Sequence, residues 1–335
     1  MTGVTPKLLN QRASGDPWRV DIVVAEGFVL VELSGVVEVL RMANRISPAP
    51  LFDWTYRSRT GGYVTSLAGL GMDTETLAER PDADYVFVIG NSDSDHPELS
   101  LGGVIKTYTY RRAKVLLLSE AASRYISENP EDSDAHTTHW ENRAVLQERG
   151  EPGGDGTYAL AVDDGRIVTC AGMESAVDLT LGLVGNHMSA AGVMTAADIL
   201  LHEKIRDFKT LQPFGGKRLT MTGDKELDQC IELMQSHMED PRPISDLVEQ
   251  VGISSRSLER RFHRHLNTTP NTYYRELRLN WANNLLLNTT LTVREIGMAC
   301  GFPNGFSSLY RSFFGVTPTA IRQKKRTTGR RSQQA

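Results

Sequence analysis

Nine polar side chains near the carboxyl end of the chain stand at spacings that would gather them on two short helices. The first helix would present five of them and the second four, namely Arg256, Glu259, Arg260, His263 and Arg264, and then Asn304, Ser307, Ser308 and Arg311. An arginine can form two hydrogen bonds with the edge of a guanine or pair with a phosphate group. These residues therefore indicate contact with a nucleic acid, although a solvated helix bundle would show a similar pattern of charges.

The elements that would position these side chains form an internal repeat of two helices joined by a turn. Apolar residues occupy positions i, i+3, i+4 and i+7 counted from Ile244 and again from Val293, and Gly252 and Gly301 follow at i+8. Glycine suits the left-handed backbone that ends a helix and begins a tight turn. The second helix of each copy has an apolar seam at intervals of four residues: Leu258, Phe262 and Leu266, and Phe306, Tyr310 and Phe314. This is the helix-turn-helix pattern, in which the second helix enters the major groove of DNA.

The second copy differs from the first in its turn and in its charge. We expect its turn to be one residue shorter and its second helix to open with residues 303–305, where Gly305 would weaken it. The outward face of this helix carries Arg311 as its one arginine, against three in the first copy. We therefore expect the second helix to bind DNA more weakly or to read fewer bases.

The charge of the chain is divided unevenly along its length. Residues 1–250 hold 23 basic and 38 acidic side chains, whereas residues 251–335 hold 14 basic and 3 acidic ones. A basic segment on an acidic body is typical of a protein that meets a polyanion, which could be nucleic acid, anionic lipid or an acidic protein. The repeat favours nucleic acid. Five basic residues would add phosphate contacts that weaken with salt: Lys324, Lys325, Arg326, Arg330 and Arg331.

Composition predicts a cytoplasmic protein without a metal or a disulfide. Of the 335 residues, 40% are apolar and 23% are charged, and no apolar run approaches the roughly 20 residues of a membrane span. The polar first 17 residues lack the apolar core of a signal peptide. The cysteines, Cys170, Cys230 and Cys300, form no C-x-x-C pair and are expected to be buried thiols. His136 and His139 have no third metal ligand nearby in sequence, which favours structural roles.

Short apolar runs alternate with helical stretches through the first two thirds of the chain. The expected strands are residues 19–25, 85–90 and 114–119, with a hairpin of residues 157–163 and 166–170 around Asp164-Gly165. Helices are expected at residues 29–45, 139–149 and, with glycine interruptions, 174–206. This alternation predicts an α/β domain with a flavodoxin-like parallel sheet and helices on both faces, followed by an all-α domain with two helix-turn-helix units.

Turn-forming residues around positions 207–224 mark the boundary between these domains. The expected order is a flexible tail at residues 1–17, the α/β domain at 18–207, a linker at 208–225, the DNA-binding domain at 226–326 and a polar tail at 327–335.

Two stretches of the sequence resemble known families. Residues 227–325 resemble the DNA-binding domain of AraC/XylS regulators, through SLERRFHRHLNTTP at 257–270 and GFSSLYRSFFGVTP at 305–318. Residues 18–206 resemble the PfpI/ThiJ-type, class I glutamine amidotransferase-like domain, through residues 20–45, HTTHW at 136–140 and residues 162–184. The order of the two is similar to that of the GlxA-type subfamily, which implies two recognition helices in successive major grooves and a first domain that senses an effector and dimerises.

The second resemblance raises the question of catalysis. Enzymes of that fold carry a cysteine nucleophile on a sharp strand-to-helix turn, and the resemblance places Ser119 at this position. A serine needs a base, which His139 could supply with Glu32 or Glu120 orienting it, but the glycines expected for an oxyanion hole are absent. We therefore predict that the protein is not an enzyme. The alternative is a PfpI-like hydrolase or amidotransferase fused to a DNA-binding domain.

Ligands of doubly wound sheets bind beyond the carboxyl ends of the strands. That rule predicts an effector pocket lined by Glu32, Asn91, Ser119, Glu120, His139, Trp140 and Glu174. An acidic and aromatic pocket would favour a cation, such as an amine, a quaternary ammonium compound or an amino-acid derivative. In the alternative, Trp140 packs in the core and the glutamates are solvated or cap helices.

Together these features predict a transcription regulator that binds double-stranded promoter DNA. We expect a homodimer that acts with RNA polymerase as an activator, away from any membrane, and responds to a small metabolite without needing a cofactor. A regulator without an effector, controlled by a partner protein or by its own abundance, is a further possibility.

Overall fold

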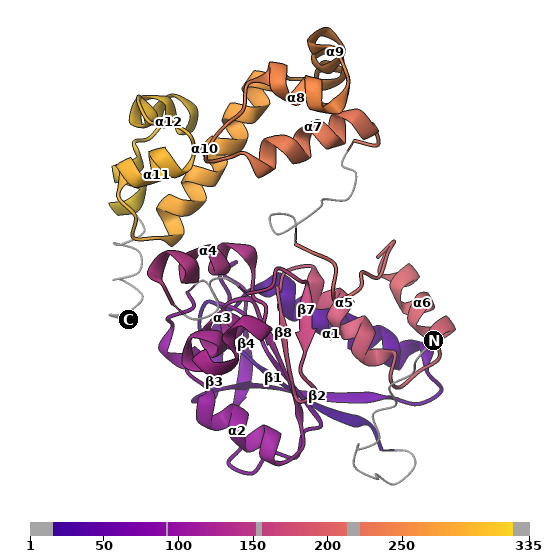
Figure 1. Cartoon of the computed structure of the whole chain (residues 1–335). Coiled ribbons are helices and arrows are strands. Elements are labelled where there is room, and N and C mark those ends of the chain that lie inside the picture. The colour runs from indigo at the N-terminus through magenta and orange to yellow at the C-terminus, as the bar shows by residue number, and fades with distance from the viewer. Residues whose placement is uncertain (1–15, 92, 152–155, 213–221, 324–335) are drawn as a thin grey trace. The chain divides into compact units, whose positions relative to one another are not determined.

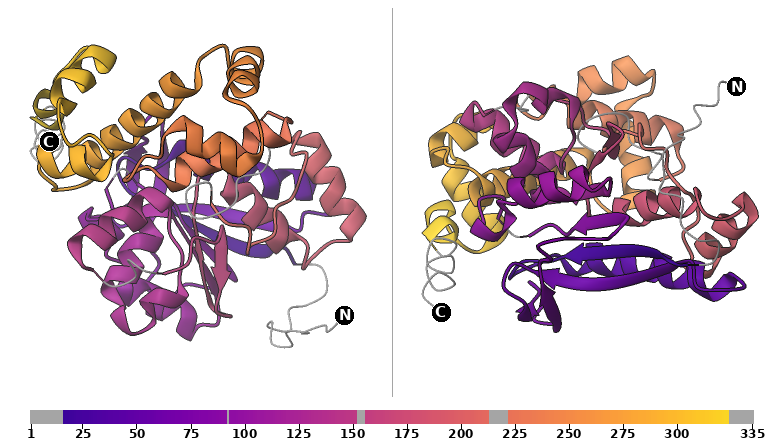
Figure 2. Two further views of the ribbon diagram at one scale, coloured as in Figure 1. Left: turned by 45° about the horizontal axis from the view of Figure 1, so that its top comes forward. Right: turned by 90° about the horizontal axis from the view of Figure 1, so that it is seen from below.

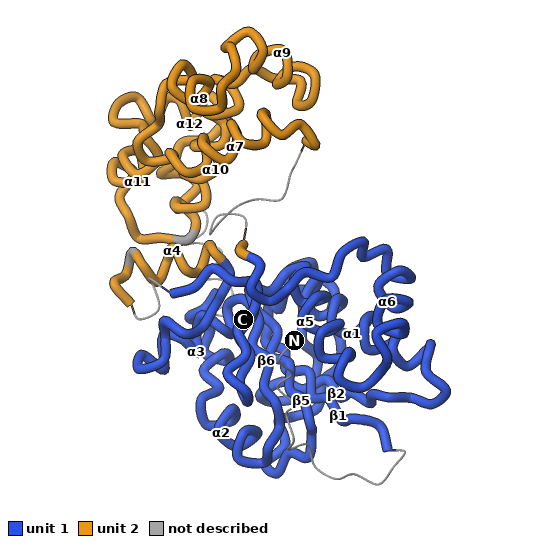
Figure 3. Tube along the Cα trace, turned by 45° about the vertical axis from the view of Figure 1, so that its right-hand side comes forward, with its two compact units in different colours: residues 1–139, 155–210 blue, residues 140–154, 211–335 orange. Residues whose placement is uncertain are grey.

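The chain divides into two compact units. The structure, a computed structural model, describes residues 16–91, 93–151, 156–212 and 222–323. One unit comprises residues 1–139 and 155–210, and the other comprises residues 140–154 and 211–335 (Figure 3). The expected division differs at residues 140–154, which the sequence placed in the α/β domain. Most of the expected N-terminal tail, residues 213–221 of the expected linker, the polar tail and the five basic residues from Lys324 onward lie outside the described residues.

The first unit is built on one eight-stranded sheet (Figure 1). Its strand order is β3-β4-β2-β1-β5-β6-β8-β7, and all neighbours are parallel except β3 with β4 and β7 with β8. The central order β2-β1-β5-β6-β8 is the flavodoxin-like arrangement, which confirms the predicted fold class. The strands are β1 Trp18–Val23, β2 Phe52–Ser58, β3 Gly62–Thr65, β4 Gly71–Thr76, β5 Tyr85–Val88, β6 Lys114–Leu118, β7 Ala161–Asp163 and β8 Ile167–Cys170.

Side chains of the central strands alternate between two apolar cores, one on each face of the sheet. In β6, Leu116 and Leu118 enter the core that also holds residues of α1, α5 and α6, and Val115 and Leu117 enter the core shared with α2 and α3. Strands buried on both faces read as continuous apolar runs, which is why β1, β5 and β6 were predictable. The helices are α1 Leu30–Ile46, α2 Gly102–Tyr110, α3 Ser119–Glu128, α5 Ser175–Val184 and α6 Ala190–Ile199, with short 3-10 helices at Pro97–Leu99 and Pro130–Ala135.

The second unit is helical and has two small cores that share one long helix. Leu258 and Phe262 belong to the first core, with Tyr274 from the start of α10, and Phe306 and Tyr310 belong to the second. Figure 2 shows α10 extending from the α7–α9 group to α11 and α12. The helices are α4 Trp140–Arg149, α7 Lys225–Ser236, α8 Ile244–Val251, α9 Ser255–Leu266, α10 Pro270–Asn288, α11 Val293–Ala299 and α12 Phe306–Phe314.

Two general expectations can be compared with these elements. Among the described residues, no helix combines the length and the apolar character needed to traverse a lipid bilayer. Cys170, Cys230 and Cys300 are all buried and form no disulfide, as predicted.

Candidate nucleic-acid interface and ligand site

Helix α9 presents the first predicted group of polar side chains to solvent. The helix begins after Ser254, whose hydroxyl accepts a hydrogen bond from the Ser257 amide, and it buries Leu258 and Phe262 against the unit. On its other side, all five predicted side chains are exposed: Arg256, Glu259, Arg260, His263 and Arg264. The preceding helix α8 ends at Gly252, which has the left-handed φ of 78° that its position required. A rigid helix with three exposed arginines can enter a groove and contact base edges.

Arg261 lies beside Arg260 in sequence but serves the fold. Its guanidinium pairs with Asp224 and lies 3.4 Å from a carboxylate oxygen of Glu226. Asp224 in turn caps α7 by accepting a hydrogen bond from the Leu227 amide. Arg261 therefore ties α9 to the start of α7, and this use leaves Arg256, Arg260 and Arg264 as the outward arginines.

Helix α12 begins later than the sequence predicted. Pro303, Asn304 and Gly305 precede it, and Gly305 is its N-cap residue with a φ of 72°. The expectation that Gly305 weakens the helix is wrong, because the residue lies outside the helix in a conformation that glycine adopts readily. The turn of residues 300–305 is also longer than the turn of residues 252–254, not shorter. The predicted side chains are nevertheless exposed: Asn304, Ser307, Ser308 and Arg311.

Helix α10 anchors the second helix-turn-helix unit through specific contacts. Arg278 donates a hydrogen bond of 3.0 Å to the carbonyl oxygen of Gly301, and its guanidinium lies 4.4 Å from the centre of the Phe302 ring. The Tyr310 hydroxyl donates to Asn283 Oδ1 at 2.5 Å. The contacts hold the turn before α12, and α12 itself, on the same helix that completes the core beneath α9.

A buried cluster lies where β1, β5 and β6 end in the first unit. Ser119 has a φ of 43° at the junction of β6 and α3, a strained strand-to-helix turn. Its Oγ lies 2.5 Å from Glu32 Oε1 and 2.9 Å from the carbonyl oxygen of Ala171. The Glu32 carboxyl group also accepts hydrogen bonds from the amides of Gly90, at 2.8 Å, and Met173, at 2.9 Å. We call these five residues the Ser119 cluster.

The Ser119 hydroxyl is the donor in both of its contacts, to Glu32 Oε1 and to the carbonyl oxygen of Ala171, so one proton is shared between two acceptors. Burial raises the pKa of Glu32, whereas the hydrogen bonds from Ser119, Met173 and Gly90 act in the opposite direction. Both side chains are completely buried, and a Cβ atom on Gly172 would overlap Ser119 Oγ and Glu32 Oε1. The cluster is therefore a closed group of buried hydrogen bonds.

The structure brings some of the other predicted pocket residues to this end of the sheet. The Asn91 amide donates to Glu120 Oε2 at 3.1 Å, and the Asn91 side chain donates to the Glu26 carbonyl oxygen at 2.5 Å. Glu174 is exposed and is the N-cap residue of α5. Sequence patterns did not indicate that the Gly90 and Met173 amides and the Ala171 carbonyl group would bond with Glu32 and Ser119. Every residue has such backbone groups, so residue types do not reveal which of them take part.

The two predicted residues from the HTTHW stretch have different environments. Burial lowers the pKa of His139 to about 4, so its ring is neutral at physiological pH. Trp140 is counted with the second unit, where its ring stacks on Trp281 with 5.4 Å between ring centres. The Ser119 hydroxyl bonds with Glu32 and Ala171, not with His139, so the Ser–His pairing required of a catalytic serine is not formed.

His136 is buried and has a packing role. Its Nδ1 lies 3.4 Å from Thr169 Oγ1, and its ring meets Tyr125 edge-on. No group of three or more potential metal ligands occurs in the part of the chain that the structure describes.

A chain that combines a doubly wound α/β unit with two helix-turn-helix units joined by one long helix is a DNA-binding transcription regulator. Its DNA-binding domain is of the AraC type, and a family described as a helix-turn-helix domain matches residues 247–324.

Similar proteins extend over almost the whole chain. The HTH-type transcriptional regulator GbdR of Pseudomonas aeruginosa is 28% identical over 96% of this chain and 87% of its own length. The HTH-type transcriptional regulator GlxA of Rhizobium meliloti is 26% identical over 91% of this chain and 96% of its own length. Among solved structures, an AraC family transcriptional regulator from Pseudomonas putida is 25% identical with a TM-score of 0.47, covering 55% of this chain and 100% of that chain.

Proposed function

We propose that this regulator activates transcription from specific promoters in response to a small metabolite bound by its first unit. The observation that carries the DNA-reading part is the pair of exposed polar helix faces on α9 and α12, each backed by buried residues that fix the helix. We further propose that it acts in the cytoplasm as a homodimer that contacts RNA polymerase. Dimerisation would place the helix pairs of two chains on adjacent DNA sites.

Retention of genomic DNA fragments by the purified full-length protein tests the DNA-reading part. We expect a small set of fragments with a shared sequence to be retained at physiological salt. The Arg260→Ala variant should alter this set, whereas a substitution of an exposed residue outside α9 and α12, such as Glu239→Gln, should not. Retention without sequence preference by all three proteins would contradict the proposal.

The effector site that we propose lies around Asn91, Glu120, His139 and Glu174, beside the Ser119 cluster. Because Glu32 is completely buried, the acidic groups nearer to solvent are Glu120 and Glu174, which would attract an amine, a quaternary ammonium group or an amino-acid derivative. A ligand of the native state must raise the unfolding temperature. We expect one compound among choline, betaines and amino acids to do so for the full chain, and Glu120→Gln to abolish the rise. Glu131→Gln, at an exposed acidic residue away from the site, is the matched control.

We also propose that the chain does not catalyse a reaction. The backbone of Ser119 does favour the alternative, a PfpI-like hydrolase or amidotransferase, because its φ of 43° is that of a nucleophile turn. Its hydroxyl, however, is completely buried and bonds with Glu32 and Ala171 rather than with a histidine. Esterase and amidase assays on the wild type and on Ser119→Ala would separate the two readings: a robust activity that the substitution removes would establish the enzyme.

A further inference from the structure

We infer that the first unit has a second ligand site, which binds a small organic anion with an apolar body. The site is a cavity of about 570 Å³ at the ends of the strands opposite the Ser119 cluster. It is lined by Tyr85 and Lys114, which begin β5 and β6, and by Arg166, which precedes β8. Its volume is in the range of cavities that hold small molecules.

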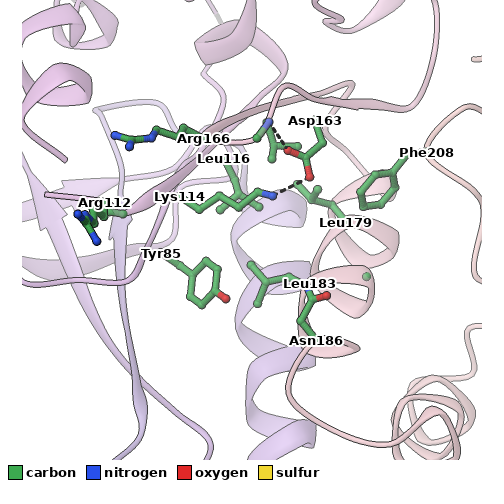
Figure 4. A pocket seen from close by; sticks show the side chains of 14 residues that line it. Tyr85, Arg112, Lys114, Leu116, Asp163, Arg166, Leu179, Leu183, Asn186 and Phe208 are labelled. Atoms are coloured by element: carbon green, nitrogen blue, oxygen red, sulfur yellow. Dashed lines mark hydrogen bonds and ion pairs between the residues drawn. The ribbon is translucent and has the colours of Figure 1, made fainter. Parts of the chain in front are cut away.

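The interior of the cavity is apolar. Leu116, Leu179 and Leu183 line it as members of the core beneath α5, and Phe208 forms a further wall (Figure 4). Gly182 lets this aromatic ring approach, since a Cβ atom there would lie 2.9 Å from Phe208 Cζ. Apolar surface in an open cavity favours a ligand with a hydrocarbon portion, which removes that surface from water.

The mouth of the cavity is positively charged. Lys114 Nζ lies 2.6 Å from Asp163 Oδ2, so these two charges offset each other. Arg166 donates a hydrogen bond of 2.6 Å to the Thr109 carbonyl oxygen, which holds its side chain without neutralising it. Across the described ranges, neither Arg112 nor Arg166 forms an ion pair with a carboxylate. A carboxylate, which can take two parallel hydrogen bonds from a guanidinium, is the group that such a mouth favours.

The backbone of Arg112 makes this residue a suitable position for a test variant. Arg112 follows α2 with a φ of 68°, in the left-handed region where glycine is favoured. This conformation is a common way for a helix to end, and here the amides of Arg112 and Ala113 donate to the carbonyl oxygens of Thr109 and Tyr108. The position also offers a clean variant, because Arg112→Gly removes the guanidinium and relieves the backbone at the same time.

This site is independent of the effector site proposed above. The two lie at opposite ends of the parallel strands and have opposite charge, so they would take different ligands. The binding of an anion at this site can therefore be tested independently of whether an amine at the other end controls DNA binding.

The test is calorimetric titration of the full chain with hexanoate and with phenylacetate, beside hexylamine and hexanol as matched compounds without the carboxylate. We expect saturable binding of at least one carboxylate with one site per chain, and binding of the amine and the alcohol at least about tenfold weaker. Arg112→Gly and Arg166→Gln should each weaken carboxylate binding about tenfold, the first without lowering the unfolding temperature. Asn186→Trp, at an exposed residue that lines the cavity, should block it.

Arg111→Gln is the matched control, because it removes an adjacent exposed charge that does not line the cavity. Three results would overturn the inference: no saturable binding of either carboxylate at millimolar concentration, binding that Arg112→Gly, Arg166→Gln and Asn186→Trp leave unchanged, or binding that Glu120→Gln at the other end of the sheet abolishes instead.

Discussion

Glu32 is a carboxyl group whose environment decides its chemistry. Its side chain accepts two backbone amides and contacts Ser119 Oγ in a place without solvent, and burial raises its pKa. A charged Glu32 could have oriented a base or attracted a cation, as the sequence suggested. In the structure Glu32 is completely buried, and it instead holds the strained turn at Ser119 in place.

The first prediction concerns the pH dependence of stability. A carboxyl group whose pKa is higher in the folded state stabilises the fold fully below the pKa of the unfolded chain, and that contribution is lost as pH rises through the folded pKa. Glu32→Gln has no such dependence, but its amide cannot accept both backbone hydrogen bonds, which costs about 1–3 kcal/mol. The variant should therefore be clearly less stable than the wild type at acidic pH, and the difference should shrink as pH rises. Denaturant unfolding at several pH values measures this, and a constant difference would show that the pKa of Glu32 is the same in the folded and the unfolded chain.

The second prediction contrasts two adjacent arginines. Arg260→Ala should leave the unfolding temperature unchanged and reduce discrimination at one or two base positions by about 1–3 kcal/mol each. Arg261→Ala should lower the unfolding temperature, because it removes the pairing with Asp224, and should weaken binding to all sequences alike. Competition binding on a library of base-substituted sites, with melting curves of both variants, distinguishes them. A uniform loss for Arg260→Ala would make it a phosphate contact.

At the scale of elements, the two helix-turn-helix units obtain similar recognition faces from different turns. The first turn is short and exposed around Gly252, where a Cβ atom would meet nothing within 4 Å. The second is longer, and a Cβ atom on Gly301 would lie 2.5 Å from Pro241 Cδ and 3.0 Å from an Arg278 nitrogen. The second turn is therefore packed against the body of the domain, which compensates for its length.

The third prediction follows from this difference. Both glycines have a positive φ, so Gly252→Ala should cost about 1 kcal/mol of unfolding free energy from backbone strain alone. Gly301→Ala should cost more than about 2 kcal/mol, because overlap with the Pro241 ring adds to the strain. Denaturant unfolding of the full chain measures both. Equal losses would mean that Pro241 moves aside freely.

At the scale of the whole molecule, an acidic body carries a basic carboxyl-terminal segment. The excess positive charge after residue 250 should drive association with DNA through release of counterions, in a salt-dependent way. Arg256, Arg260 and Arg264 contribute from a rigid helix. Lys324 and Lys325 follow the last described residue, and we expect them to add phosphate contacts of their own.

The fourth prediction concerns the salt dependence of DNA binding. Each phosphate contact adds about 0.9 to the slope of log affinity against log salt concentration, so the Lys324→Gln/Lys325→Gln double variant should flatten the slope by about 1.8. Sequence preference should be unchanged, since lysines at phosphates read no bases. Binding isotherms at several salt concentrations supply the slope, and one equal to that of the wild type would exclude a phosphate role for these lysines.

The sequence by itself determined the elements whose burial is uniform or periodic. The apolar runs of β1, β5 and β6, the alternation that makes the sheet parallel, and the seams at Leu258 and Phe306 follow from local residue patterns. The half-buried strands β2, β3 and β4 did not show such patterns. In β2, Arg57 pairs with Asp21 of β1 at 2.8 Å, a polar partnership over 36 residues that no local pattern reveals.

Only the tertiary structure decided what the side chains at the strand ends do. It buried Glu32 and Ser119 in one group of hydrogen bonds, committed Arg261 to the fold, placed Trp140 against Trp281, and opened a positively charged cavity at the amino ends of the strands. Charge state and access to solvent depend on neighbours brought together by folding, and residue types along the chain do not contain that information.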